Sequence, residues 1–194
     1  MEFKIFKFDE VTSTNDVAIN LIKREKQETG YVLAKTLLKG RGTHGKKWVS
    51  EKGNFFGSIF FPLKKNYPPF DEFSLINPVI ISNVMKKICK SVNVSLKWPN
   101  DIFINKKKVC GILQELVTYD NKKFLIVGIG INIVSNPVIN DKYQATNIYY
   151  EIKKKPSTNE IFKLIISSYK NFFLNLNSYN YGNFKKEANL MVLN

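Results

Sequence analysis

Hydrophobic and polar positions follow two periods along the chain, and these periods separate expected strands from expected helices. Residues 3–11 alternate apolar and polar side chains, as a half-buried strand does. Residues 12–26 instead repeat apolar positions four apart, and Ser13 or Thr14 could cap the helix that this pattern predicts. Further strands are expected at 31–38, 54–63, 94–99, 101–105, 107–119 and 123–133.

Two longer helices complete the pattern. Residues 70–92 are helical by length and periodicity, with Pro78 near an early turn or at a kink. A last helix is expected to begin after Ser157, which has capping-box spacing to Glu160, and to run through Leu176. Runs of strands with a few helices favour an α+β fold with a mixed or antiparallel sheet around one core, rather than a doubly wound α/β sheet.

Residues 37–54 ("LLKGRGTHGKKWVSEKGN") follow neither period. This loop holds four glycines, six basic residues including His44, and Trp48. Glycines let backbone N–H groups approach an anion closely, and the basic side chains supply charge, so the loop is a candidate anion site. Its lysines are not followed by Ser or Thr at a helix start, as in the triphosphate loop. Its glycines match the dinucleotide pattern G-x-G-x-x-G in letters but lead into "KKWVS" rather than an apolar helix. A mobile surface turn with Trp48 in the core is the alternative.

Composition narrows the class of protein. The 194 residues carry a formal net charge of +14, but 28 of the 30 basic residues are lysines spread along the chain, as on a solvated surface. One of the two arginines, Arg41, lies in the glycine-rich loop, which favours a site that uses a planar guanidinium. With two cysteines, no apparent signal peptide and no apolar run of membrane-spanning length, we expect a cytoplasmic protein without a membrane segment.

Polar residues and glycines also mark the ends and interiors of the later strands. Pro99 fixes a turn from which Asn100 and Asp101 emerge together, although both are common turn residues. Lys108 begins the next strand. The segment "GIGIN" (128–132) places glycines in a β-branched strand, which indicates close approach of a ligand or of another backbone, or a bulge.

Five motifs in this order resemble the catalytic domain of biotin protein ligases. They are "STN" (13–15), "GRG...GKKW" (40–48), "KWPND" (97–101), "KVCGIL" (108–113) and "GIGIN" (128–132), and the resemblance covers about residues 8–175. It implies a class II synthetase-like fold and an ATP-dependent ligase. Such an enzyme makes biotinyl-5'-AMP and then biotinylates a lysine of the biotin carboxyl carrier protein or domain of acetyl-CoA carboxylase.

The resemblance also implies roles for particular residues. Lys108 would lie between the biotin carboxylate and the α-phosphate, Arg41 would wrap the adenylate, and Asp101 would lie near the same centre to help magnesium or the incoming lysine. The catalytic set is therefore Lys108, Arg41 and Asp101. The implied biotin-binding residues are Ser13, Thr14, Asn15, Arg41, Gly42, Thr43, Lys108, Gly111, Leu113, Gly128 and Ile131. The implied ATP-binding residues are Gly40, Arg41, Lys46, Trp48, Asn100 and Asn132, and Mg²⁺ would come with ATP rather than occupy a metal site of its own.

Several features depart from the family pattern. Thr43 stands where the family usually has a second arginine, Leu37 where it usually has glutamine, and Lys46 where arginine is frequent. The first two changes remove polar contacts, so we expect a less tightly held adenylate. The loop is expected to order when an anion binds. The ligase domain is expected at 1–180, followed by a short tail at 181–194, with no DNA-binding domain ahead and no C-terminal β-barrel domain.

Three alternatives stay open. A lipoate or octanoate protein ligase would share the fold and an equivalent of Lys108, but it resembles the chain less at "KWPND". A basic nucleic-acid-binding protein without catalysis would fit the net charge. A degenerate ligase would bind biotin without turnover. A monomer and a homodimer are both compatible with the sequence.

Overall fold

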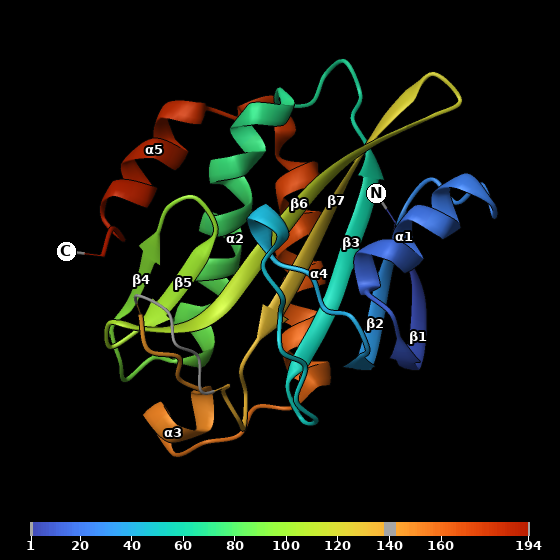
Figure 1. Ribbon diagram of the computed structural model, residues 1–194. Helices are drawn as coiled ribbons and strands as arrows, with labels where there is room; N and C mark the ends of the chain where they lie inside the picture. Colours follow the sequence, from blue (N-terminus) through green and yellow to red (C-terminus); the bar gives the residue numbers. More distant parts are fainter. Residues whose placement is uncertain (1, 138–142, 194) are drawn as a thin grey trace.

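The computed structural model describes residues 2–137 and 143–193 of the chain, and Figure 1 shows their arrangement. Residues 1, 138–142 and 194, which belong to the expected domain and tail ranges, lie outside this description. The strands are β1 (Lys4–Val11), β2 (Gly30–Leu37), β3 (Phe55–Pro62), β4 (Val94–Lys97), β5 (Asp101–Ile104), β6 (Lys107–Tyr119) and β7 (Lys122–Ile131). The α-helices are α1 (Thr14–Lys23), α2 (Phe73–Ile88), α3 (Ile148–Ile152), α4 (Thr158–Leu174) and α5 (Tyr181–Asn189). Short 3₁₀ turns lie at Thr43–Gly45, Phe70–Glu72 and Leu176–Ser178.

The strands form one seven-stranded sheet in the order β1-β2-β3-β7-β6-β5-β4. Only β1 and β2 pair in parallel, and every other neighbouring pair is antiparallel. The long β6–β7 hairpin at the centre pairs Gly111 with Gly130 and Leu113 with Gly128. The expected mixed sheet with a few helices is confirmed.

The two faces of the sheet carry different cores. One face packs against α2, α4 and α5 and contains most of the buried apolar residues, including Ile129 and Ile131 of β7. On the opposite face, α1 covers a smaller cluster that includes Phe124 and Ile126 of the same strand (Figure 1). Because side chains alternate along a strand, odd-numbered positions of β7 face the larger core and even-numbered positions face the α1 side. The rest of the α1 side is left to the glycine-rich loop.

Local sequence explains where the helices begin. Ser13 is the N-cap of α1 and accepts a bond from the Asp16 backbone N–H, which selects it over Thr14. Ser157 caps α4 in the same way through the Glu160 N–H, as its spacing predicts. Pro78 lies inside α2, and this helix ends at Ile88, so residues 89–92 are not part of it.

Three features differ from the sequence-based expectation. Strand β1 is present but mostly exposed; Ile5 and Phe8 are 47% and 37% exposed. Helix α4 ends before Leu176, which lies in a 3₁₀ turn. The expected tail contains α5, which packs on the larger core through Ala188.

The end of the chain also joins the sheet edge. The Leu96 N–H donates to the Met191 carbonyl, and the Leu193 N–H donates to the Leu96 carbonyl. These two bonds extend the sheet beyond β4. Among the described residues, no helix is both long enough and apolar enough to cross a membrane.

Candidate active site

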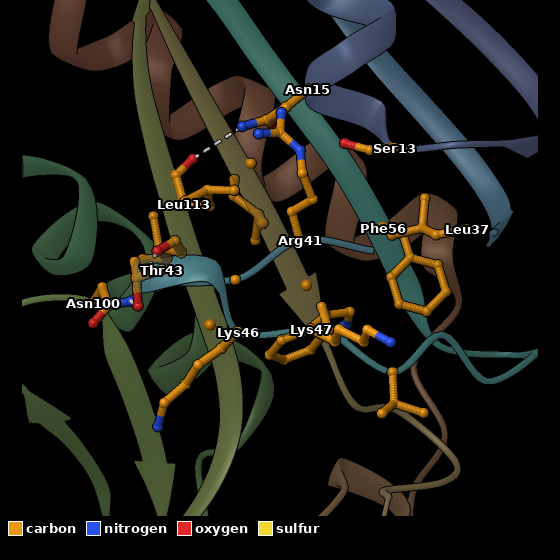
Figure 2. Close-up of a pocket in the computed structure, with 18 of the residues that line it drawn as sticks. Ser13, Asn15, Leu37, Arg41, Thr43, Lys46, Lys47, Phe56, Asn100 and Leu113 are labelled. Carbon is orange, nitrogen blue, oxygen red and sulfur yellow. Dashed lines mark hydrogen bonds between the residues drawn. The ribbon is translucent and has the colours of Figure 1, made fainter. Parts of the chain in front are cut away.

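A pocket opens on the α1 side of the sheet, above the middle of β6 and β7 and beneath the glycine-rich loop (Figure 2). Segments that are distant in sequence meet in it: the start of α1, the loop, the turn before β5, and the central hairpin. Fifteen of the expected site residues line it. They are Ser13, Thr14, Asn15, Arg41, Gly42, Thr43, Lys46, Trp48, Asn100, Asp101, Lys108, Gly111, Leu113, Gly128 and Asn132.

Asn15 is fixed at one end of the pocket. It is 2% exposed, and its Nδ2 donates to Glu115 Oε2 at 2.7 Å and to the Leu113 carbonyl at 3.4 Å. Its Oδ1 accepts from the Ser58 hydroxyl at 2.6 Å. Since these bonds use both N–H hydrogens, the second lone pair of Oδ1 is what Asn15 can offer a ligand. Asn15 is therefore a fixed acceptor for a ligand N–H.

Gly128 makes room for Asn15. A Cβ at position 128 would lie 2.4 Å from Asn15 Oδ1 and 3.1 Å from its Cγ. Such distances are far inside van der Waals contact, so any side chain here would push Asn15 out of its position. The glycine at this strand position is explained by close approach of a side chain, one of the readings that strand glycines suggest.

Trp48 rests on a pair of glycines, Gly111 and Gly130. A Cβ at Gly130 would lie 2.5 Å from indole Cε2, and a Cβ at Gly111 would lie 2.7 Å from Cζ3. Because Gly111 and Gly130 are register partners on β6 and β7, together they form a flat platform for the indole. The alternative in which Trp48 tucks into a core is thus partly right, but the surface beneath it is the pocket floor rather than the packed interior.

The loop is folded back on itself as a small hairpin. The Gly42 N–H donates to the Lys46 carbonyl at 2.7 Å, the Trp48 N–H donates to the Gly40 carbonyl at 2.9 Å, and Arg41 forms a β-bridge with Lys47. His44 occupies the left-handed region with φ of 54°. Backbone bonds within the loop hold this form. Two carboxylates near Arg41 add negative charge beside its basic residues.

Arg41 bridges those carboxylates. Its Nη1 and Nη2 donate to the two oxygens of Glu115 at 2.9 and 2.8 Å, and Nη2 also donates to Asp16 Oδ1 at 2.7 Å. Partial burial lowers the pKa of the guanidinium, but the bonds to Glu115 and Asp16 outweigh this effect and leave that pKa above its ordinary value. Arg41 therefore enters the pocket rim as a permanent, oriented positive charge.

Lys108 and Asp101 form an ion pair between the two ends of the pocket. Lys108 Nζ lies 2.7 Å from Asp101 Oδ1, and about a quarter of each side chain is exposed. The ammonium also lies 5.8 Å from the centre of the Trp48 ring. The backbone of Lys108 is tied to Gln144 and Thr146. The ammonium is therefore held near the indole on one side and a carboxylate on the other.

Asn132 carries an acceptor without a protein partner. Its Nδ2 donates to the Thr146 carbonyl at 3.0 Å, while its Oδ1 is buried and meets no donor within the part of the chain that the structure describes. Buried polar atoms are nearly always paired, so this oxygen is a candidate contact for a ligand N–H. Asn100 differs, because its Nδ2 already donates to the Ile112 carbonyl at 3.1 Å and faces Thr43 Oγ1 at 3.4 Å.

Two expected residues have a different position. Ile131 was expected in the pocket wall, but its side chain is fully buried in the core on the helix side, because odd positions of β7 face away from the pocket. Gly40 does not line the pocket; a Cβ there would lie 2.4 Å from the Trp48 carbonyl oxygen, so its role is to let the loop hairpin close. The expectation that the side chain of Ile131 forms part of the pocket wall is therefore wrong.

Three residues that sequence reasoning missed complete the site: Ser58, Glu115 and Asp16. Ser58 is fully buried on β3 and its hydroxyl reaches both Thr14 and Asn15. Glu115 could have been suspected, because it shares strand parity with Gly111 and Leu113 and is a charged residue near the centre of a long strand. Asp16 and Ser58 carried no comparable signal. No group of three or more histidine, cysteine or acidic residues arranged for a metal ion occurs among the residues described here.

Comparison with known proteins agrees with the geometry. A sequence model of the biotin/lipoate A/B protein ligase family matches residues 6–132. The biotin--[acetyl-CoA-carboxylase] ligase of Paracoccus denitrificans is 30% identical over 127 residues, which cover 64% of this chain and 52% of that protein. The bifunctional ligase/repressor BirA of Escherichia coli is 31% identical over 131 residues, which cover 66% and 40%. The chain therefore matches about half or less of these relatives' length.

Solved structures of biotin protein ligases resemble this chain over its whole fold. The biotin protein ligase of Leishmania major in complex with biotinyl-5-AMP superposes with a TM-score of 0.84 at 25% identity, covering 100% of this chain and 83% of that one. The biotin protein ligase of Aquifex aeolicus in complex with biotin and ATP gives a TM-score of 0.81 at 28% identity, covering 98% and 78%. The resemblance stated from the five motifs is confirmed.

Proposed function

The chain belongs to the biotin/lipoate A/B protein ligase family, and we propose that it is an ATP-dependent biotin protein ligase. In the proposed reaction, a biotin carboxylate oxygen attacks the α-phosphorus of ATP and pyrophosphate leaves. The amine of a carrier lysine then attacks the acyl carbonyl of biotinyl-5'-AMP, and AMP leaves. The carrier would be the biotin carboxyl carrier protein or domain of acetyl-CoA carboxylase.

The observation that carries this proposal is the distribution of acceptors along the pocket. The ureido ring of biotin has two N–H donors and one carbonyl acceptor, and it would meet the fixed Oδ1 of Asn15 with the hydroxyls of Ser13 and Thr14 nearby. At the other end, adenine would lie on the indole of Trp48 and donate its amino group to the unpaired Oδ1 of Asn132. One end thus suits a ureido ring and the other a purine.

Between these ends lies the charge that adenylyl transfer needs. Negative charge grows on the phosphate as the carboxylate attacks, and Lys108 would stabilise it. Arg41 and Lys46 would neutralise the rest of the triphosphate, and Mg²⁺ would arrive as the counter-ion of ATP. Two anions have to meet, so positioning and positive charge contribute more than a strong base.

Asp101 would serve the second half-reaction. Its Oδ1 lies 2.7 Å from Lys108 Nζ. Once Lys108 has moved its contact to the phosphate, the freed carboxylate would be the nearest anion to receive an incoming lysine ammonium. The same carboxylate would also be close enough to the phosphates to assist magnesium. Both roles predict that loss of Asp101 slows the reaction without preventing biotin binding.

Lipoate or octanoate ligation is the second candidate, because the family includes it. Leu37 favours this reading in one respect, since it lines the pocket with an apolar side chain where a polar contact is expected. The dithiolane or alkyl tail of those substrates, however, has no donor for the second lone pair of Asn15 Oδ1, which a ureido N–H would use. No observation in the pocket favours nucleic acid. The same proposal includes a cytoplasmic location, a biotin carboxyl carrier protein or domain as the acceptor, and a monomer or a homodimer.

A direct test compares acyl substrates in the first half-reaction. Pyrophosphate release is followed with Mg-ATP and biotin, lipoate or octanoate, at equal concentrations. The proposal expects release with biotin that exceeds the other two by at least tenfold, and loss of this preference in Asn15→Ala. Equal or greater release with lipoate or octanoate would assign the chain to the other branch of the family.

A further inference from the structure

Glu115 contacts two residues of the site that come from different segments of the chain. It lies on β6 two residues beyond Leu113, and about a quarter of its side chain is exposed. Its carboxylate accepts from three donors: Asn15 Nδ2 at 2.7 Å, Arg41 Nη1 at 2.9 Å and Arg41 Nη2 at 2.8 Å. Asn15 belongs to α1, whereas Arg41 belongs to the loop. One side chain on the central hairpin therefore contacts a residue from each of these two segments.

The geometry leaves Glu115 little freedom. Its Oε2 is shared by Asn15 and Arg41, and Oε1 completes a bidentate pair with the guanidinium. Moving Asn15 shifts the oxygen on which Arg41 depends, and moving Arg41 shifts the oxygen on which Asn15 depends. Bidentate arginine–carboxylate pairs also fix the plane of both groups. The orientation of Asn15 and that of the guanidinium are thus mechanically linked.

Asp16 differs from Glu115 in the contacts that matter. It takes one bond from Arg41 Nη2 and makes no contact with Asn15 through its carboxylate, and 40% of its side chain is exposed. These bonds use one N–H of Nη1 and both of Nη2, so the Nε–H and the second N–H of Nη1 are left to meet a phosphate oxygen. A phosphate could replace Asp16 on Arg41 while the bidentate pair with Glu115 stays in place.

We propose that Glu115 is a positioning residue that couples biotin binding to ATP binding through its shared contacts with Asn15 and Arg41. This inference rests on the proposed function. Biotin held on Asn15 Oδ1 would fix the Asn15 amide, which fixes Glu115, which in turn holds Arg41 in the orientation that receives the phosphates. Linkage requires the effect to be reciprocal, so ATP would raise biotin affinity by the same factor.

The test measures this coupling factor by calorimetry. The dissociation constant of α,β-methylene-ATP is determined with and without saturating biotin, and that of biotin with and without the analogue. In the unmodified protein, each ligand is expected to tighten the other by roughly tenfold, within the usual range of coupling between sites. In Glu115→Gln the coupling factor is expected to fall to about one. Asn15 and Arg41 both donate to the carboxylate, and the NH₂ group of glutamine cannot accept a hydrogen bond from either of them.

Two control variants separate positioning from other effects. Asp16→Asn weakens one bond to Arg41 but leaves the Asn15–Glu115–Arg41 chain intact, so the coupling factor is expected to persist even if ATP affinity falls. Glu28→Gln removes an exposed carboxylate that pairs with Lys122 away from the pocket and is expected to change neither affinity. Thermal unfolding of each variant shows whether the fold is retained, and Glu115→Ala provides a second variant without an amide donor.

The outcomes are distinct. A coupling factor in folded Glu115→Gln and Glu115→Ala equal to that of the unmodified protein would overturn the inference. So would independent binding of the two ligands in the unmodified protein, although the proposed function would then stand. If the unmodified protein bound no biotin, the proposed function itself would fail first.

Discussion

Gly128 and Gly130 lie two residues apart on β7, and each contacts a different end of the pocket. Substitutions at these two glycines should therefore perturb biotin binding and ATP binding separately. Gly130→Ala would place a Cβ 2.5 Å from Trp48 Cε2. Carbon atoms ordinarily meet at about 3.5 Å or more, so the indole must move by about 1 Å. Gly128→Ala would place its Cβ 2.4 Å from Asn15 Oδ1 and displace that side chain instead.

The magnitudes follow from overpacking and from misplacement. Forcing a methyl group into a packed contact costs about 1–3 kcal/mol of stability. A catalytic group misplaced by about 1 Å can lose roughly 100-fold in rate. We therefore expect Gly130→Ala to weaken ATP binding and adenylate formation by about 10- to 100-fold while biotin affinity changes less than about threefold. Gly128→Ala should weaken biotin binding and leave the affinity for the ATP analogue in the absence of biotin nearly unchanged.

The assay is calorimetry with each ligand alone, together with pyrophosphate release and thermal unfolding. Gly57→Ala is the matched control, because its Cβ would lie 2.6 Å from Tyr31 Oη on the helix side of the sheet. It should lower stability without selecting between the ligands. If Gly128→Ala and Gly130→Ala weakened both ligands equally, or if Gly57→Ala reproduced either profile, the division of the pocket into two ends would be refuted.

Three further predictions concern retention of the intermediate, the core and the cysteines. Thr43→Arg replaces a side chain whose Oγ1 lies 3.4 Å from Asn100 Nδ2. The added guanidinium should slow adenylate release by about 5- to 150-fold, from about 1–3 kcal/mol of charged hydrogen bonding. Unchanged release after rapid dilution would count against the weak-retention hypothesis. Tyr169→Phe removes a 2.8 Å bond to buried Asn77 Oδ1 and should cost about 1–3 kcal/mol in denaturant unfolding. Burial raises the pKa of Tyr169 above its ordinary 10.0, so its stabilising contribution is complete below pH 10.0 and is lost as pH rises beyond it, and the variant should show less alkaline loss; equal slopes would contradict this. Burial raises the pKa of Cys89 to about 12 and that of Cys110 still further, so neither thiol should react with iodoacetamide at pH 8 until the protein unfolds, and mass spectrometry of the native protein showing alkylation would contradict the packing.

Alternation and apolar runs predicted most of the sheet from the sequence, because interior strands such as β3, β5 and β7 bury most of their side chains, β3 at every position. They did not predict the exposure of β1, since alternation says nothing about whether other elements cover a strand. Helix α5 was missed because only Ala188 of its nine residues is buried, so the segment lacks a clear apolar stripe. Strand order was equally out of reach, because it depends on pairings far apart in the chain.

The site shows the same division. Glycines, basic residues and motif order identified fifteen residues that the fold brings to one pocket. Parity along β7 could have excluded Ile131, which alternates with Gly128, Gly130 and Asn132 and must face the other way. The Asn15–Glu115–Arg41 chain joins positions up to 100 residues apart. No local pattern encodes such contacts, so they became visible only with the structure.

The most direct test of the proposed function is transfer of biotin to a carrier. The protein is incubated with biotin, Mg-ATP and a biotin carboxyl carrier domain, and the mass of the carrier is followed. Lys108→Ala is compared with Lys107→Ala. In the unmodified protein the Lys107 ammonium lies outside the pocket, near Tyr150 and Glu151. The account predicts biotin addition that is lost in Lys108→Ala and retained in Lys107→Ala. Absence of addition by the unmodified protein, or equal addition by both variants, would contradict it.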